Sequence, residues 1–176
     1  MNDCEAKGCN VNVQARKNLS WLCLSLLVVA LDMLSKYVVS STMVLGQSIP
    51  VLPVFSWTLA HNYGAAFSFL HDAGGWQRWF FAGIAIVVSI GMIWWLKTLQ
   101  AGARFLAIAL ALVLGGAIGN LYDRILLGYV VDFIHVHYGA WNFPAFNLAD
   151  SAITVGAIML VIDSVFFEKK RQAGNV

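Results

Sequence analysis

The sequence predicts an α-helical membrane protein with four transmembrane helices, and three observations carry this prediction. Of the 176 residues, 60% are hydrophobic and only 11% are charged, whereas a soluble domain has about a quarter of its residues charged. The apolar residues gather in four runs of about 18–22 residues, each long enough to cross a bilayer as a helix. Basic residues flank these runs mainly on one side, as the positive-inside rule describes for multi-pass proteins.

The chain begins with a polar stretch, residues 1–18, that we expect to form a disordered cytoplasmic tail. The first span runs from Leu19 to about Val39. A signal peptide also combines basic residues with an apolar core, but this run is too long and no small-residue cleavage site follows it. Asp32 and Lys36 interrupt the outer end of the span at a spacing of four residues, which places them on one helix face where they can pair.

Two longer segments, residues 40–75 and 125–146, separate the spans on the side opposite the tails. In the first, β-branched and aromatic residues between Val51 and Leu59 are bounded by turn residues, a pattern typical of short strands. The run His61–Phe67 follows, and its small residues beside an asparagine suit a close backbone approach to a ligand. Composition alone favours a simple turn there. The second segment is rich in aromatic residues.

Three further spans complete the predicted bundle. They run from Trp76 to about Leu96, from Phe105 to about Tyr122, and from Phe146 to Phe167. In the third span Ala111, Gly115 and Gly119 recur every four residues and give a flat face for close helix packing. The spans and the outer segments therefore form one domain, residues 19–168, which a cytoplasmic C-terminal tail, residues 169–176, follows.

The distribution of charge predicts that both termini are cytoplasmic. The two tails and the short loop between the second and third spans hold most of the basic residues: Lys7, Arg16, Lys17, Lys97, Arg104, Lys169, Lys170 and Arg171. The opposite side has only Lys36, Arg78 and Arg124, and two of these lie at span ends. Both outer segments should therefore face away from the cytoplasm.

Polar residues cluster between Gly115 and Asp150 among apolar neighbours. Ionisable groups at membrane depth are costly, so they usually serve function or a buried ion pair. Asp132 and Asp150 lie at the same membrane level, and two close carboxylates that share a proton can hydrolyse a peptide bond. Alternatively, Asn147 caps a helix in which Asp150 is the third residue, and Asp132 is a solvated loop acid. Spacing alone favours these structural roles.

The remaining polar residues suggest supporting roles. Asn120, Asp123 and Arg124 share the outer end of the third span and can form an ion-pair and hydrogen-bond network that positions a substrate carbonyl. Asp163 is expected to make a structural contact between helices. The scattered histidines and cysteines lack the spacing of a zinc site or a disulfide framework. These residues are His61, His71, His135, His137, Cys4, Cys9 and Cys23. In a strand, His135 and His137 would lie on one face as a possible metal pair, but no carboxylate or cysteine at ligand spacing accompanies them.

Five blocks of sequence resemble the lipoprotein signal peptidases (signal peptidase II), the bacterial aspartic membrane proteases. They occur in the order found in that family and extend from the first span to the fourth. The blocks are Asp32-Met33-Leu34-Ser35-Lys36, His61-Asn62-Tyr63-Gly64-Ala65-Ala66-Phe67, Gly115 through Arg124, Val131-Asp132-Phe133, and Phe146-Asn147-Leu148-Ala149-Asp150-Ser151.

The resemblance implies an intramembrane aspartic endopeptidase that cleaves a prolipoprotein just before a cysteine carrying diacylglycerol. It places the catalytic pair on Asp132 and Asp150, and requires no metal or other cofactor. The other family motif positions, which bind substrate or support the site, fall on Asp32, Lys36, Asn62, Gly116, Asn120, Asp123, Arg124, Asn147 and Ala149. It also implies a small periplasmic β-cradle within 40–69 and a short mobile periplasmic helix around 70–76.

The partners that follow are diacylglyceryl prolipoproteins and membrane lipids, without nucleic acid, and globomycin-type compounds are the expected inhibitors. We expect a monomer in the bacterial inner membrane, with its active site toward the periplasm. A small transporter or ion-conducting helix bundle is the alternative, but the acidic residues cluster at one membrane face and do not line a path. A third possibility is a structural assembly subunit that uses the Gly115–Gly119 face to bind another protein. The packing of the four helices already needs this face, so it is no evidence for a partner.

Overall fold

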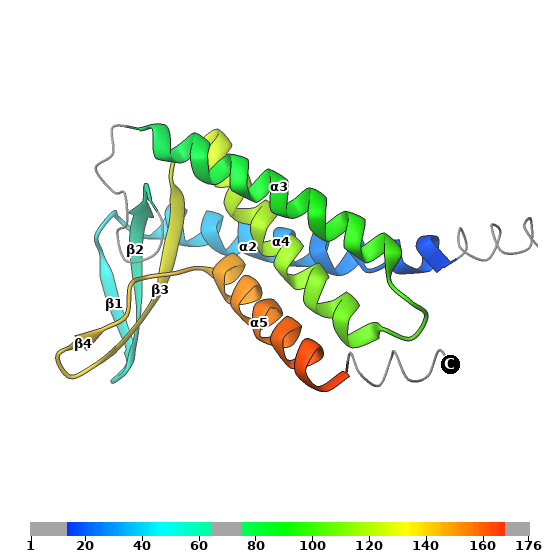
Figure 1. Ribbon diagram of the computed structural model, residues 1–176. Coiled ribbons are helices and arrows are strands. Elements are labelled where there is room, and N and C mark those ends of the chain that lie inside the picture. The colour runs from blue at the N-terminus through cyan, green and yellow to red at the C-terminus, as the bar shows by residue number, and fades with distance from the viewer. Residues whose placement is uncertain (1–13, 65–74, 168–176) are drawn as a thin grey trace, which may run out of the picture.

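The computed structural model describes residues 14–64 and 75–167, and within them four helices are long and apolar enough to cross a membrane. The four are Gln14–Thr42, Trp76–Thr98, Arg104–Leu126 and Leu148–Phe167. They run side by side, and a small sheet lies beyond one end of the bundle (Figure 1). The predicted class, a four-helix membrane protein with a small sheet, is therefore confirmed.

The first membrane helix starts earlier than the sequence predicts. It begins at Gln14 and includes α2 (Leu22–Thr42), whereas the predicted span starts at Leu19. Asn18 explains the difference, because its buried side-chain amide donates to the carbonyl of Leu99 over 2.7 Å and ties the helix start to the bundle. Residues 1–13 and 168–176, which hold most of both predicted tails, lie outside the described residues.

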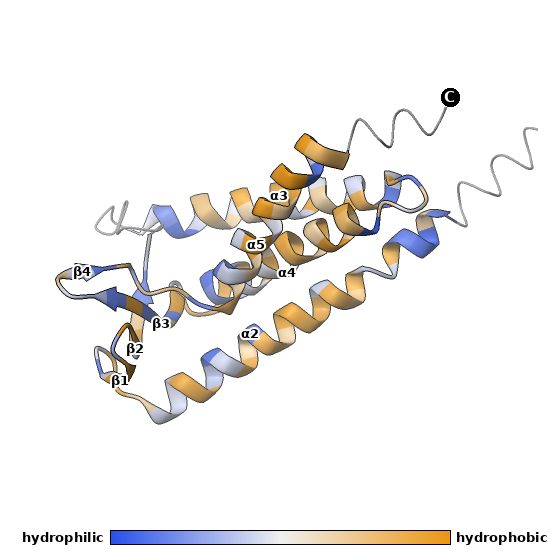
Figure 2. Ribbon diagram, turned by 90° about the horizontal axis from the view of Figure 1, so that it is seen from below, coloured by the Kyte–Doolittle hydropathy of each residue, from blue (hydrophilic) through white to orange (hydrophobic). Residues whose placement is uncertain are grey.

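Helix α4 (Arg104–Leu126) is the centre of the bundle. It packs against α2, α3 (Trp76–Thr98) and α5 (Leu148–Ile162), and α5 continues into a π-helical turn, η2 (Asp163–Phe167). In the most apolar stretch of α4, 67% of the residues are buried inside the protein. The corresponding share in the other three membrane helices is 17–22%. The membrane helices are mostly hydrophobic along their length (Figure 2). The outer three expose apolar side chains such as Leu26, Val87 and Val161, a surface that suits a lipid environment.

Glycines on α4 let its two neighbours approach closely. A methyl group on Gly115 would lie 2.8 Å from the carbonyl oxygen of Ser25 on α2, and one on Gly119 would lie 2.7 Å from a carboxylate oxygen of Asp32. A methyl group on Gly116 would instead overlap the carbonyl oxygen of Ala149 on α5. The glycine face predicted from the four-residue spacing therefore packs on α2, and Gly116 adds a second close contact with α5.

The sheet has four antiparallel strands in the order of the chain. They are β1 (Ser48–Leu52), β2 (Phe55–Asn62), β3 (Val130–Tyr138) and β4 (Trp141–Asn142). Pairing of β2 with β3 sets Ala60 opposite Asp132 and Asn62 opposite Val130. The β1–β2 hairpin confirms the predicted strands, whereas the sequence predicted only an aromatic outer segment where β3 lies. The predicted short helix around 70–76 falls mostly on residues 65–74, outside the described residues.

Candidate active site

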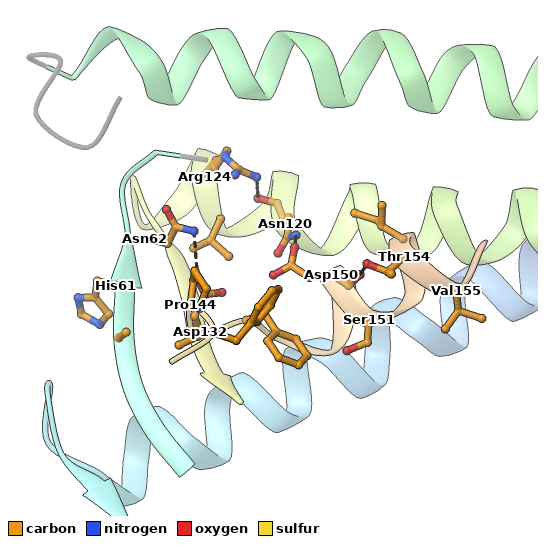
Figure 3. Close-up of a pocket in the computed structure, with 16 residues that line it drawn as sticks. His61, Asn62, Asn120, Arg124, Asp132, Pro144, Asp150, Ser151, Thr154 and Val155 are labelled. Carbon is orange, nitrogen blue, oxygen red and sulfur yellow. Dashed lines mark hydrogen bonds between the residues drawn. The ribbon is translucent and has the colours of Figure 1, made fainter. Parts of the chain in front are cut away.

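A cavity of about 710 Å³ lies where α4, α5 and the strands β2 and β3 meet (Figure 3). Polar groups from all four elements face it, and most of the remaining wall is apolar. The polar lining is Asn62, Asn120, Arg124, Asp132 and Asp150, with His61, Ser151 and Thr154, and the rest is Ala60, Val130, Phe143, Pro144, Ala145, Phe146, Ile153 and Val155. The two aspartates that the sequence placed at one membrane level therefore share one cavity.

Asp150 reaches the cavity from the first turn of α5. Asn147 is the N-cap, as predicted: its side-chain oxygen accepts from the amide of Asp150 over 2.9 Å, and Asp150 Oδ2 accepts from the amide of Asn147 over 3.3 Å. The second carboxylate oxygen is not used in the cap. It accepts from Nδ2 of Asn120 over 2.7 Å. The capping role and a catalytic role are thus compatible, because each uses a different oxygen.

Asp132 lies on β3 and is only 2% exposed. Its Oδ1 accepts from Nδ2 of Asn147 over 2.8 Å and its Oδ2 from Nδ2 of Asn62 over 3.1 Å. The alternative of a solvated loop acid is therefore wrong. Burial raises the pKa of Asp132 to about 7 and the charge of Asp150 adds to this rise, against the lowering effect of the Asn62 hydrogen bond. This carboxyl can consequently hold a proton near neutral pH.

Asn147 connects the two aspartates. Its side-chain oxygen is fixed by the amide of Asp150, so its NH₂ group points the other way, toward Asp132. The same NH₂ group lies 3.2 Å from the carbonyl of Val131 and 3.1 Å from Oδ1 of Asn120. Asn147 is fully buried. One carboxamide therefore fixes the strand and the helix that carry the pair relative to each other.

A buried charged cluster lies beside the pair. The ammonium of Lys36 lies 2.7 Å from Asp32, which confirms the predicted pair, and 2.9 Å from Asp123. Asp32 also accepts from the amide of Ala149 over 2.9 Å, and Asp123 accepts from the amide of Val131 over 3.1 Å. Each bond fixes the residue immediately before one of the two cavity aspartates.

Packing and a second cation complete the surroundings. Ala149 is fully buried, and Gly116 faces its carbonyl without a side chain between them. Arg124 lines the cavity, donates to the carbonyls of Asn120 over 3.3 Å and Gly64 over 3.4 Å, and lies over the ring of Phe81. Five of the sequence-predicted site residues line the cavity, and the others support that wall from behind. The five are Asn62, Asn120, Arg124, Asp132 and Asp150.

Sequence reasoning missed most of the apolar wall. Ile153 and Thr154 lie three and four residues after Asp150 in the sequence, and this helical spacing could have placed them on the same face. The stretch Phe143–Phe146 carries no polar motif. Arg78, which the sequence placed only among the basic residues of the outer side, donates to the carbonyl of Ile125 at the end of α4 and thereby supports the turn into β3.

The other candidate residues lie elsewhere. The rings of His135 and His137 are 5.3 Å apart, and the rings contact Thr58 and Ser56. In the part of the chain that the structure describes, no three metal-binding side chains come together. Asp163 is 2% exposed, in η2, and His71 lies outside the described residues.

Residues 24–166 match the family model described as signal peptidase (SPase) II. The chain belongs to the signal peptidase II family. It is 62% identical over 160 residues to a lipoprotein signal peptidase of Pseudomonas syringae pv. tomato, covering 90% of this chain and 91% of the relative. It is 55% identical over 168 residues to a lipoprotein signal peptidase of Acinetobacter baumannii, covering 91% and 96%.

A solved structure supports the same assignment. A bacterial membrane enzyme determined by the in meso method at 2.3 Å resolution superposes with a TM-score of 0.75 at 34% identity, covering 83% of this chain and 87% of that one. Membership in the signal peptidase II family makes the chain a membrane protease. The transporter and the structural subunit are not favoured, because the family match spans all four helices and the motif blocks.

Proposed function

We propose that Asp132 and Asp150 are the catalytic pair with which this chain removes signal peptides from prolipoproteins. The observation that carries the assignment is their convergence on one cavity, where Asn147 contacts both residues. The raised pKa of Asp132 supports it further, because an aspartic mechanism needs one protonated and one ionised carboxyl. The names of the relatives support a prolipoprotein as the substrate.

The reaction uses both members of the pair. The ionised carboxylate takes a proton from a water molecule as the water oxygen attacks the scissile carbonyl carbon, and the protonated carboxyl donates its proton to the carbonyl oxygen. When the tetrahedral gem-diol intermediate collapses, one of its hydroxyls returns its proton to the ionised carboxylate as the carbonyl re-forms. The carbon–nitrogen bond breaks, and the leaving nitrogen takes a proton from the protonated carboxyl. The pair again holds one proton, ready for the next turnover.

The apolar wall suits a substrate that arrives from the bilayer. Phe143, Phe146, Ile153 and Val155 line the cavity beside the polar pair, so a membrane-embedded signal peptide can bind without leaving an apolar environment. Cleavage occurs just before the diacylglyceryl-modified cysteine, whose acyl chains remain in lipid. The enzyme works as a monomer in the bacterial inner membrane, with its termini in the cytoplasm and its cavity toward the periplasm.

Turnover of a lipidated precursor in detergent tests the catalytic pair. Asp132→Asn and Asp150→Asn keep the side-chain size but remove the shared proton, so each should lower turnover by at least about 10²-fold. The double variant should lose little more than either single one, since residues that act as a unit are not additive. Each variant should still bind an uncleaved substrate mimic.

Two outcomes would overturn the assignment. The first is substantial turnover by either single variant with its fold intact. The second is loss of wild-type turnover on treatment with a chelator and its recovery on addition of zinc, which would point to metal-assisted hydrolysis. The chelator arm therefore separates the aspartic mechanism from the commonest alternative.

A further inference from the structure

We propose that Lys36 is a positioning residue that acts through Asn120 to keep Asp150 as the ionised member of the catalytic pair. The proposal rests on the function proposed above and assigns a separate role to each aspartate. Asp150 activates the water molecule, and Asp132 carries the proton to the scissile carbonyl.

The first step of the argument is the surroundings of the lysine ammonium. Lys36 is 4% exposed and has three close oxygen partners: Asp32, Asp123 and Oδ1 of Asn120, the last at 3.1 Å. An ammonium has three hydrogens and accepts none. The two carboxylates are ion-paired with the ammonium, and its hydrogen bond is directed at a neutral carboxamide on the helix that lies beside the pair.

The second step is the orientation of that carboxamide. Because Lys36 can only donate, the oxygen of Asn120 must face it, and the NH₂ group must then face the opposite way. Nδ2 of Asn120 indeed donates to Oδ1 of Asp150 over 2.7 Å. Asn147 also donates to Oδ1 of Asn120 over 3.1 Å, but its NH₂ group is shared with Asp132 and the carbonyl of Val131. The charge-assisted bond from Lys36 is therefore the stronger constraint.

The third step is the asymmetry between the two aspartates. Both accept two N–H bonds, but only Asp150 accepts from an amide whose oxygen is bound to a buried cation, and such chains of hydrogen bonds polarise one another. Only Asp150 lies in the first turn of a helix, where the dipole favours a negative charge. Asp132 is on a strand and nearly fully buried, an environment that favours the neutral carboxyl.

The charge balance of the site favours retention of a proton. Two cations face four carboxylates, so ionisation of both catalytic residues would leave two negative charges uncompensated. The titratable and charged groups around Asp150 are Asp132 on β3, His61 on β2, Asp123 and Arg124 on α4, and Asp32 and Lys36 on α2. Neutral His61 adds nothing to this balance. The surroundings therefore disfavour ionisation of both aspartates, and the Lys36–Asn120 chain decides which of them is ionised.

The test is the pH profile of turnover in a charge-balanced variant. Asp32→Asn with Lys36→Met keeps the formal charge of the buried cluster, and an asparagine at position 32 can still accept from the amide of Ala149. One negative and one positive charge are removed together, so their long-range effects on Asp150 largely cancel. The specific change is that Asn120 loses its ammonium partner. The carboxylate of Asp150 becomes less stabilised, so the acid limb should move up by about one pH unit. Turnover at the optimum should fall by about 10²-fold.

Two companion variants make the test specific. Asn120→Leu removes the intermediate group, so it should shift the acid limb by itself, and adding the position 32 and 36 replacements to it should shift the limb no further. Ser25→Ala is the matched control, because the hydroxyl of Ser25 also links α2 to α4 through a buried 2.8 Å bond to the carbonyl of Ala111, away from the cavity. It should leave the pH profile unchanged.

Three results would overturn the proposal. An unchanged acid limb in Asn120→Leu would do so even if the position 32 and 36 variant does not fold. An unchanged limb in the folded position 32 and 36 variant would make Lys36 merely structural. An equal shift in the presence and absence of Asn120 would mean that Lys36 acts directly. An error in the catalytic assignment itself would be detected separately, because Asp132→Asn or Asp150→Asn would then retain turnover.

Discussion

Carboxamides hold the catalytic carboxylates at the scale of single residues. Asn62 donates to Asp132, Asn120 donates to Asp150, and Asn147 contacts both. An amide has a donor end and an acceptor end, so it can orient a carboxylate without competing for its proton. The orientation of Asn62 is fixed as well, because its oxygen accepts from the amide of Gly64 over 3.1 Å. These side chains do no proton transfer in the proposed mechanism.

Asn62→Ala should therefore weaken turnover less than loss of either aspartate. A hydrogen bond to a neutral group contributes about 1 kcal/mol, which corresponds to roughly a fivefold loss of rate. The bond from Asn62 lowers the pKa of Asp132, so its removal should raise that pKa. The basic limb of the pH profile, which reports loss of the Asp132 proton, should then move to higher pH.

Rates measured across the pH range with purified Asn62→Ala check this prediction. The wild-type profile should be bell-shaped, because turnover falls when both aspartates are protonated and again when both are ionised. Complete inactivity of folded Asn62→Ala, combined with persistent activity of Asp150→Asn, would contradict the division of roles. A basic limb that moves to lower pH would also contradict the role of Asn62.

At the scale of elements, the site depends on how closely the start of α5 approaches α4. Ala149 lies against Gly116, and its amide is bound by Asp32 from α2, so three helices meet at the residue before Asp150. A rigid contact of this kind transmits a change in helix spacing directly to the carboxylate. The same contact predicts a matched pair of glycine substitutions.

Gly116→Ala should impair both stability and turnover. The added methyl group would overlap the carbonyl of Ala149, and overpacking of this kind costs about 1–3 kcal/mol. The shift of α5 would move Asp150 relative to Asp132, and a displacement of about 1 Å can cost about 10²-fold in rate. Thermal unfolding in detergent and precursor turnover measure the two effects.

Gly83→Ala and Gly91→Ala on α3 are the controls for that substitution. A methyl group at either position would meet no atom within 4 Å, and alanine favours a helix over glycine. Both variants should retain wild-type turnover. Equal damage from Gly116→Ala and from these controls would show that the close contact with α5 has no special importance.

The sequence predicts the spans and the Asp32–Lys36 pair because these features are local. Hydropathy and helical spacing act within one stretch of chain. The hydrogen bond of Lys36 to Asn120 and the pairing of Asn62 with Val130 join distant segments, and no local periodicity encodes them. β3 was missed although its β-branched and aromatic residues are typical of a strand, because aromatic residues are equally frequent at membrane surfaces. The catalytic pair was assigned from resemblance, since spacing alone favoured structural roles.

At the scale of the whole molecule, the buried site affects which basic residues contribute to the positive-inside rule. Lys36 is compensated by Asp32 and Asp123 inside the bundle. Arg124 is directed at main-chain carbonyls beside the cavity. Neither cation is a free surface charge, so the sheet end of the bundle is even poorer in effective positive charge than its sequence suggests. Among the described residues, the opposite end holds Arg16, Lys17, Lys97 and Arg104.

A reporter fused after Val176 should therefore be cytoplasmic, and one inserted in the exposed β3–β4 turn at Gly139 should be periplasmic. An alkaline phosphatase reporter, active only outside the cytoplasm, and a fluorescent protein that matures only inside it give opposite readings at each site. Precursor turnover by the Gly139 insertion serves as the control for intact folding. The reverse pattern in an active protein would put the cavity on the cytoplasmic side. It would also show that the charge asymmetry does not set the orientation of this protein, and the charge asymmetry is the basis for placing the cavity on the periplasmic side.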